Sequence, residues 1–483
     1  MKTLLIIFAL LIWNLAAAQQ KFSREEMIED ISFFGRLLIN NDPISTVEEK
    51  KASRLYFEKK LTTFDKNDLS TGEFIRYLRE LKSIAKYDSH AGISFTDTVP
   101  PTNLFPLPVI VMDRKLFVNI ENDSIPFGSI IHSINGIGTS EILYKLTGGD
   151  TTSTLKLGKL VNEFFYLYYL ILGPSEQFII EYSLKSENKI KKTTVRGIDI
   201  FKYLEVDTQK TFPLHRDFFY TQYYPETDTY YLQLNSFSWP SIKDSNQSIQ
   251  TFQHLFDSLF TDIKRKQAKN VIIDLKNNLG GEMSIAILLF SYFIDSSMSV
   301  AGTFKLPADV TLSNLVSINK IPVENDSSAI AILNKYKQHT VTEGQHDKGT
   351  FEQSLSPNLN KFNGNLYVLI SGRTFSAAVD FTALIKAYNK AVLVGEKVGS
   401  SIYNSTAGLI LQYQLPNTKL IIETPIVSLN FSDQITSKLP EKYISPDIKL
   451  SFESRYKYFL EKKDADLEET LLLIQQKHLK EKN

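Results

Sequence analysis

The sequence predicts a mixed α/β protein, and three features of its 483 residues support this class. Between residues 230 and 294, apolar runs alternate with helical periodicities, which is typical of a sheet with parallel strands and crossover helices. A further strand-to-helix pair spans residues 364–388. Residues 100–198 contain short strand patterns around turn signals, so a separate β-rich module is expected there.

The composition and the N-terminal residues limit which partners and which cellular compartment are expected. The 54 basic residues balance the 54 acidic ones, so no nucleic-acid partner is expected. Lys2, an apolar stretch over residues 4–15 and three alanines ending at Ala18 form a signal-peptide pattern. We therefore expect an exported protein, periplasmic or secreted, whose mature chain begins near Gln19. No later segment is long enough to span a membrane stably, and the oligomeric state is left open.

The remaining chain is predicted to fall into four parts. Residues 19–99 have helical periodicity, and residues 100–198 form the β-rich module with a helical insertion of unusually aromatic character near Phe164. Residues 199–455 carry the strand–helix alternation, and residues 456–483 end in an amphipathic helix. Residues 300–362 lack clear order and are expected to form a lid or a substrate-facing insertion.

One phrase within the β-rich module is informative. The sequence GSIIHSINGIGTSEILYKL, from Gly128 to Leu146, places a glycine before a strand, an Asn-Gly turn and a short helix. This order resembles the central part of a PDZ domain, and the resemblance implies binding of a peptide C-terminus. Any small β-barrel is the alternative interpretation.

Ser376 is the candidate nucleophile. It lies where the apolar strand Leu366–Ile370 gives way to a helical pattern that begins with Ala377. A hydroxyl at a helix N-terminus, with backbone N–H groups beside it, suits a nucleophile and half of an oxyanion hole. A serine that only caps the helix is the alternative.

A second strand leads into a glycine-rich loop. Residues 270–275 have an apolar centre, Val271 to Ile273, and Asn277, Asn278, Gly280 and Gly281 follow before the next helix. Glycines let the backbone approach a ligand and present its N–H groups. The spacing does not fit a phosphate-binding loop. If both strands are parallel neighbours, the loop lies beside Ser376 and could hold an oxyanion.

Four short phrases in a fixed order resemble the tail-specific, or C-terminal-processing, serine protease family, peptidase family S41. They are VIIDLKNNLGG (271–281), SGRTFSAAVDF (371–381), VGEKVG (394–399) and SPDI (445–448). The resemblance implies a crotonase-like αββ protease core with a PDZ-like module. It also implies Ser376 as the nucleophile and an oxyanion hole built from Ala377 and from Gly280 or Gly281.

The resemblance leaves two sources for the general base. One branch of the family uses a lysine, but Ser401 stands at that position and Lys397 precedes it. The tricorn-like branch takes a histidine from an Asp-x-His segment, which Asp88-Ser89-His90 matches. In tricorn-like sites a serine links the histidine to a distal acid, which makes Ser89 and His90 the expected pair.

The distal acid is expected shortly before the SPDI phrase. Glu441 is the first choice, and Glu423 and Asp433 are alternatives. The chain departs from the family pattern at Val379, where a glutamate is frequent, and at Tyr443, where a glycine is usual.

These observations predict an exported serine endopeptidase that hydrolyses protein or peptide substrates, with C-terminal tails as one candidate class. The alternative is a catalytically inactive family member that binds peptides or apolar ligands. No cofactor is expected. No metal site is expected either, because the sequence has no cysteine and no clustered histidines.

Overall fold

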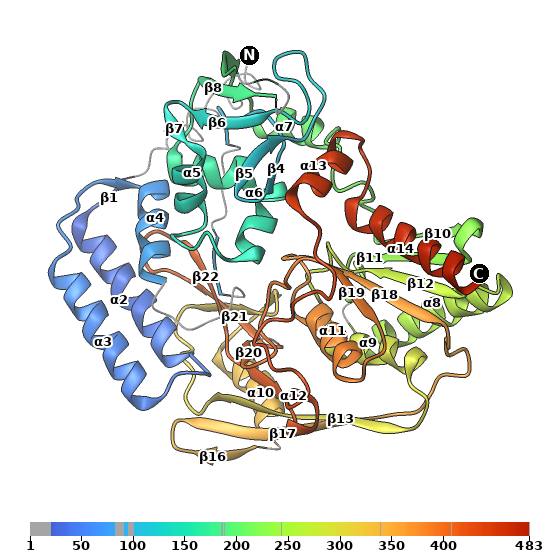
Figure 1. Ribbon diagram of the computed structural model, residues 1–483. Coiled ribbons are helices and arrows are strands. Elements are labelled where there is room, and N and C mark those ends of the chain that lie inside the picture. The colour runs from blue at the N-terminus through green and yellow to red at the C-terminus, as the bar shows by residue number, and fades with distance from the viewer. Residues whose placement is uncertain are drawn as a thin grey trace, which may run out of the picture.

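The computed structural model describes residues 21–82, 91–94, 101–184, 187, 189–242, 244–338, 340–406 and 408–482. These residues form five sheets interleaved with helices, so the predicted mixed α/β class is confirmed (Figure 1). None of the helices in these ranges combines the length and apolarity needed to span a lipid bilayer.

The expected N-terminal helices are present as a group of three. Capping boxes start the first two, in which Ser23 pairs with Glu26 and Thr46 pairs with Glu49. One face of each helix supplies aromatic residues to the core, including Phe34. The elements are β1 (Lys21–Phe22), α2 (Arg24–Asn40), α3 (Val47–Thr62), β2 (Leu69–Ser70) and α4 (Thr71–Lys82).

The central sheet has five strands in the order β10-β11-β12-β18-β19. Strands β11, β12, β18 and β19 run parallel to their neighbours, and β10 pairs antiparallel at one edge. The carboxyl ends of β12 and β18 therefore meet at the same edge of the sheet. The strands are β10 (Phe219–Tyr224), β11 (Thr229–Leu234), β12 (Asn270–Asp274), β18 (Asn365–Ile370) and β19 (Val392–Gly395).

Helices cover both faces of this sheet (Figure 1). Val271 and Ile273 of β12 share a core with the helices of one face, and Ile272 packs in a second core with α14 on the opposite face. This layering explains why β12 is buried along its whole length. The covering elements are α8 (Ser245–Arg265), α9 (Met283–Phe290), η2 (Ser291–Phe293), α11 (Ala377–Ala387) and α14 (Ala465–Lys482). The short helix η1 (Pro225–Thr227) connects β10 to β11, and α13 (Phe452–Leu460) packs against the β-rich module.

The β-rich module forms a further sheet in the order β4-β5-β6-β8-β9, with β7 paired to β6. The predicted Asn135-Gly136 turn has positive φ at both residues, and so does the turn at Asp113-Arg114 between β4 and β5. The elements are β4 (Val109–Met112), β5 (Lys115–Val118), β6 (Ile130–Ile134), β7 (Ile137–Gly138), α5 (Thr139–Leu146), α6 (Thr154–Leu172), β8 (Gln177–Ser183), β9 (Lys191–Arg196) and α7 (Ile200–Asp207).

The aromatic insertion is helix α6, and its aromatic face belongs to the core of the module. The rings of Phe164 and Tyr168 lie 5.4 and 5.8 Å from the ring of Phe105, and Tyr168 also contacts Phe178 at 5.7 Å. These rings are therefore packing partners of the sheet. They do not line an apolar ligand site.

The expectation that residues 300–362 lack order was wrong. Strands β13 and β17 pair antiparallel over ten residues each, and α10 lies in the connection between them. Two sheets complete the fold, with orders β16-β17-β13-β23-β20 and β15-β14-β21-β22-β3. Their elements are β3 (Gly92–Ser94), β13 (Met298–Pro307), β14 (Leu315–Ile318), β15 (Ile321–Pro322), α10 (Asp326–Lys337), β16 (Val341–Glu343), β17 (His346–Leu355), β20 (Ser405–Thr406), β21 (Ile410–Gln414), β22 (Ile421–Pro425), β23 (Ser428–Phe431) and α12 (Asp433–Thr436).

A buried ionic cluster fastens the C-terminal helices to the end of β12. The Lys276 ammonium forms ion pairs with Asp274, Asp464 and Asp466, and Arg455 pairs with Asp466 at 2.9 Å. Burial lowers the pKa of Lys276, but the three carboxylates outweigh burial and raise it overall. The lysine is therefore charged in the folded protein, next to the loop that follows β12.

Candidate active site

Two loops meet at the carboxyl edge of the central sheet. The loop after β12 and the loop after β18 are joined by hydrogen bonds from Phe375 N to Asn278 O (3.0 Å) and from Thr374 Oγ1 to Leu275 O (2.9 Å). The expectation that these loops lie together is confirmed, because β12 and β18 are parallel neighbours. The glycine-rich segment and Ser376 thus form one unit.

Ser376 occupies a strained position at the start of α11. Its backbone has φ 54° and ψ −129°, a conformation that L residues rarely adopt and that costs on the order of 1–3 kcal/mol. Its N–H donates to Ser400 Oγ at 3.0 Å, and its carbonyl accepts from Val379 and Asp380. The side chain is partly exposed, and no side-chain cap hydrogen bond is formed. Ser376 is thus more than a helix cap, because the strained turn presents its side chain to solvent.

Gly280 lies directly against Ser376. A Cβ atom at Gly280 would be 2.7 Å from Ser376 Cβ, 2.8 Å from Phe375 O and 2.9 Å from Ala377 N. Gly280 also has φ +99°, which favours glycine. The backbone of the glycine-rich loop therefore lies so close to Ser376 that no side chain fits between them at position 280.

Gly280 and Gly281 differ in whether the backbone N–H group has a hydrogen-bond acceptor. The Gly280 N–H donates to Asn278 Oδ1 at 2.8 Å. Within the ranges that the structure covers, the N–H groups of Gly281 and Ala377 have no hydrogen-bond acceptor. Gly281 itself is pressed against Phe237, whose backbone would lie 2.3 Å from a Cβ atom. Sequence spacing could not separate Gly280 from Gly281, whereas this hydrogen bond does.

The residues near the expected lysine position have distinct roles. Ser401 accepts from Tyr403 N at 2.9 Å and donates to Tyr403 O at 2.7 Å, so it shapes its own turn. Lys397 is exposed, and its Nζ lies 5.4 Å from the centre of the Tyr443 ring. Ser400, which is buried and bonded to the N–H of Ser376, is a contact that the sequence did not reveal.

The predicted base segment, Ser89 and His90, lies outside the described residues. Of the candidate acids, Glu423 pairs in register with Gly92 at the start of β3, which begins two residues after His90 in the sequence. Glu423 Oε1 accepts from Gln412 at 2.6 Å.

Glu441 is exposed and accepts from Ser445 Oγ at 2.5 Å. The carbonyl of the next residue, Lys442, accepts a hydrogen bond from the N–H of Ile402 at 3.0 Å. The segment of Glu441 therefore lies beside the loop that contains Ser400. Asp433 is exposed at the first turn of α12. The structure thus gives Glu441 and Glu423 distinct surroundings.

Asp380 is an acid that sequence analysis missed. It lies one helical turn after Ser376, and its carboxylate has no hydrogen-bond or ion-pair partner among the residues that the structure covers. Burial raises the pKa of Asp380 to about 7. The signal was present in the phrase SAAVD, where the acid stands one position later than the glutamate of the family pattern.

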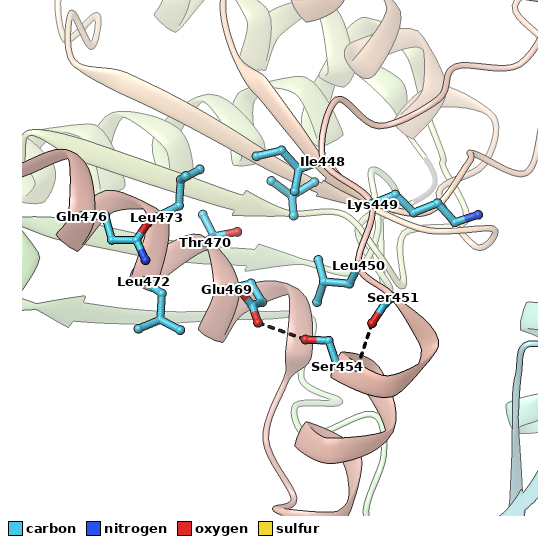
Figure 2. A pocket seen from close by; sticks show the side chains of 11 residues that line it. Ile448, Lys449, Leu450, Ser451, Ser454, Glu469, Thr470, Leu472, Leu473 and Gln476 are labelled. Atoms are coloured by element: carbon cyan, nitrogen blue, oxygen red, sulfur yellow. Dashed lines mark hydrogen bonds between the residues drawn. The ribbon is translucent and has the colours of Figure 1, made fainter.

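A cavity of about 310 Å³ lies away from these two loops, between the C-terminal helices and the segment that follows Ile448. Figure 2 shows Ser454 between Ser451 and Glu469. The Ser454 Oγ donates to Glu469 Oε1 at 3.0 Å. No residue that lines this cavity belongs to the loops around Ser376 and Gly280. Among the described residues, no group of three or more acidic or histidine side chains could hold a metal ion.

Comparison with known proteins connects this fold and site to a class. Residues 228–450 match the sequence model of Peptidase family S41. No curated protein matches the chain. Mature CPAF complexed with lactacystin is similar in structure, with a TM-score of 0.62 and 16% identity over 94% of this chain and 98% of that chain.

Two further solved structures were found at lower TM-scores. Mature CPAF alone has a TM-score of 0.59 and 14% identity over 91% of this chain and 95% of that chain. The photosystem II D1 C-terminal processing protease has a TM-score of 0.42 and 11% identity over 94% and 97%. The CPAF structures show the fold that this chain shares.

The protein is by class a serine-type peptidase. The match to Peptidase family S41 spans β12, the glycine-rich loop and the Ser376 turn, and it ends after the SPDI phrase. The four phrases that carry the sequence resemblance all lie within the matched residues.

Proposed function

We propose that the protein is an exported serine endopeptidase with Ser376 as its nucleophile. The observation that carries the proposal is the strained, partly exposed Ser376 against Gly280, with the unpaired N–H of Ala377 beside it in the described structure. A nucleophile needs both access to the substrate and donors where the oxyanion forms.

In the proposed reaction, Ser376 Oγ attacks the peptide carbonyl while His90 removes the hydroxyl proton. The carbonyl oxygen becomes an oxyanion, which the N–H groups of Gly281 and Ala377 stabilise. His90 then protonates the leaving amine, and water hydrolyses the resulting acyl-enzyme. The N–H of Gly280 is not assigned to the oxyanion, because it donates to Asn278. The role of Gly280 is to let the loop backbone lie close to Ser376.

His90 needs groups that fix its orientation, and we assign this role to Ser89 and Glu441. The match of Glu441 to the position before the SPDI phrase supports this choice. Glu423 is the second candidate, because it faces Gly92 at the start of β3. Lys397 is disfavoured as the base, since it is exposed and lies against the Tyr443 ring.

The proposed substrates are proteins or peptides, and C-terminal tails are the favoured class. The PDZ-like phrase from Gly128 to Leu146 supports capture of a chain terminus by strand addition. The signal-peptide pattern at residues 1–18 supports export, to the periplasm or beyond.

Covalent labelling tests the proposal directly. A fluorophosphonate probe should modify Ser376, as mapped by mass spectrometry, and Ser376→Ala should abolish both labelling and peptide hydrolysis. The variant should remain folded, because the Ser376 side chain forms no cap hydrogen bond that the substitution would remove. Lactacystin is a second probe, since mature CPAF has been solved in complex with it. A folded Ser376→Ala protein that keeps full activity would refute the mechanism.

The same labelling separates the enzyme from an inactive binding protein. A native chain that reacts with no probe and cleaves no peptide, yet binds peptides, would favour the binding protein.

The base is tested by the pH dependence of kcat. A histidine base predicts activity that rises through an apparent pKa of roughly 6–7 and then reaches a plateau. His90→Ala should lower kcat at least about a hundredfold, and Lys397→Ala should not. Activity that climbs above about pH 9, together with an inactive Lys397→Ala, would instead support a lysine base.

Paired variants decide between the acids. Glu441→Gln and Glu423→Gln keep the size of the side chain and remove its charge. The acid that orients His90 is the one whose replacement lowers kcat and shifts the pH profile.

A further inference from the structure

A cavity of about 350 Å³ lies where the β-rich module meets the two catalytic loops, and we call it the junction pocket. Asn277 lines it from the glycine-rich loop, and Arg373 lines it from the loop that carries Ser376. Asn162 of α6 and Lys210, which follows α7, line the opposite side. The junction pocket is thus built in part from the same two loops that carry Gly280 and Ser376.

Arg373 is a cation without a counterion. Its Nε is fully buried and has no hydrogen-bond partner, and no carboxylate of the described chain lies within ion-pair distance of its guanidinium. Burial lowers the pKa of Arg373, and Glu163 on α6 offsets this shift only in part. Arg373 is half-buried, and a charge that is partly removed from water without a partner is costly, so its guanidinium favours an anion that enters the pocket.

The aliphatic stem of Arg373 is firmly held. Its Cγ would lie 3.0 Å from a Cβ atom at Gly158, so α6 leaves just enough room for the stem to pass. The stem of Arg373 therefore packs against α6 at Gly158.

The other charges of the junction pocket do not neutralise Arg373. Lys210 is buried, and its Nζ donates to both carboxylate oxygens of Asp207 (2.7 and 2.8 Å) and to Asn162 (2.9 Å), so this pair is internally balanced. Within the described residues, the acceptors of Arg216 are backbone carbonyls, including that of Asp207 at 2.9 Å. Two guanidinium groups thus face the pocket, and its one lining carboxylate is already engaged.

We propose that the junction pocket binds a carboxylate of the substrate next to the scissile bond, with Arg373 as the specificity-determining residue. This inference rests on the proposed peptidase function and deepens it by naming the substrate chemistry. A guanidinium matches a carboxylate through two parallel N–H donors, which an ammonium cannot reproduce. The amide of Asn277 can add a further donor from the neighbouring loop.

The carboxylate has two sources, an Asp or Glu side chain or the free C-terminus of the substrate. Binding measurements on the full-length Ser376→Ala protein distinguish them, because this variant holds peptides without cleaving them. Three fluorescent peptides of equal length are compared by anisotropy at low salt. The first has internal glutamates and an amidated end, the second has glutamines and a free end, and the third has glutamines and an amidated end.

We expect one or both carboxylate-bearing peptides to bind at least about tenfold more tightly than the neutral peptide. In the Ser376→Ala background, Arg373→Met should remove this preference, because it keeps the packed stem and removes the guanidinium. Arg373→Lys should restore part of it, and added salt should weaken it. Arg373→Met should not lower Tm, because no folded-state hydrogen bond of the guanidinium is lost. Arg196→Gln is the matched control, since Arg196 is exposed at the end of β9.

Equal binding of all three peptides, absence of binding, or a preference that survives Arg373→Met would each overturn the inference. The proposed function is judged separately, by hydrolysis with the native chain. If carboxylate-dependent binding needs Arg373 but no peptide is ever cleaved, the junction pocket stands and the peptidase proposal fails.

Discussion

A methyl group placed on Gly280 would test the catalytic geometry most directly. Gly280→Ala would put a Cβ atom 2.7 Å from Ser376 Cβ and 2.9 Å from Ala377 N. Carbon atoms normally stay about 3.5 Å apart, so one of the two loops must move by roughly 0.8 Å. The methyl group would also occupy the space where the oxyanion is proposed to form.

Two effects contribute to the expected loss. Alanine at φ +99° is strained by on the order of 1–3 kcal/mol, which should lower the free energy of unfolding and Tm. A nucleophile displaced by about 1 Å can lose a hundredfold in rate. We therefore expect kcat to fall at least about a hundredfold, which is far more than the strain alone explains.

Gly136→Ala is the matched control. Gly136 also has positive φ, at +78°, but nothing lies within 4 Å of the position that its Cβ atom would take. It should show a comparable fall in Tm and nearly unchanged kcat.

The assay combines Tm from thermal unfolding, kcat for a fluorogenic peptide and the rate of fluorophosphonate labelling. Both alanine variants are measured at a temperature at which they are fully folded. If Gly280→Ala keeps kcat within about threefold of the native value while its Tm falls like that of Gly136→Ala, the reaction does not take place beside Gly280.

Three further substitutions probe the surroundings of the site. Lys276→Met should lower the free energy of unfolding by about 3–5 kcal/mol, measured by urea unfolding, because it leaves buried carboxylates without their main cation. Asp380→Asn should gain Tm relative to the native chain as pH rises from about 5 to 8. The reason is that burial raises the pKa of Asp380 to about 7, so the folded state keeps a proton that the unfolded state has released, and native stability falls with rising pH. Ser400→Ala should lower kcat, measured with a peptide substrate, because it removes the acceptor of the Ser376 N–H.

Control variants exist for the lysine and the serine substitutions. Lys269→Met breaks an exposed pair with Asp228 and should cost less than about 1 kcal/mol. Ser401→Ala removes a hydroxyl that bonds only to Tyr403, so kcat should change less than in Ser400→Ala. Equal effects of Lys276→Met and Lys269→Met, a Tm difference for Asp380→Asn that does not vary with pH, or equal effects of the two serine variants would contradict the respective argument.

The catalytic loops could be predicted from sequence because local and global signals agree there. The strand pattern before Asn277, the paired glycines and the helix onset at Ala377 are all local features. The rule that parallel strands share an edge then places both loops together.

Other parts depend on contacts that no local pattern encodes. Strands β13 and β17 pair between residues such as Met298 and Leu355. Burial along β13 does not alternate cleanly, and along β17 exposed residues alternate mostly with half-buried ones. Lys276 and Asp464 are 188 residues apart, so the sequence around Lys276 does not indicate that its partner lies near the C-terminus. In the sequence, Arg373 resembles any arginine of a loop, and its packing against Gly158 of α6 is visible only in the structure.

The site is held together by hydrogen bonds that join one loop to the next, and this has a consequence for testing substrate capture. Gly372 O lies 2.1 Å from where a Cβ atom of Gly399 would be, and Thr154 at the start of α6 lies equally close to Gly372. The β-rich module thus rests directly on the loop that carries Ser376. Deleting residues 100–198 would remove the proposed capture of substrate and, at the same time, the residues that pack against the loop of Ser376. Loss of activity after such a deletion would therefore not identify a capture role, whereas point substitutions at Arg373 leave this packing in place.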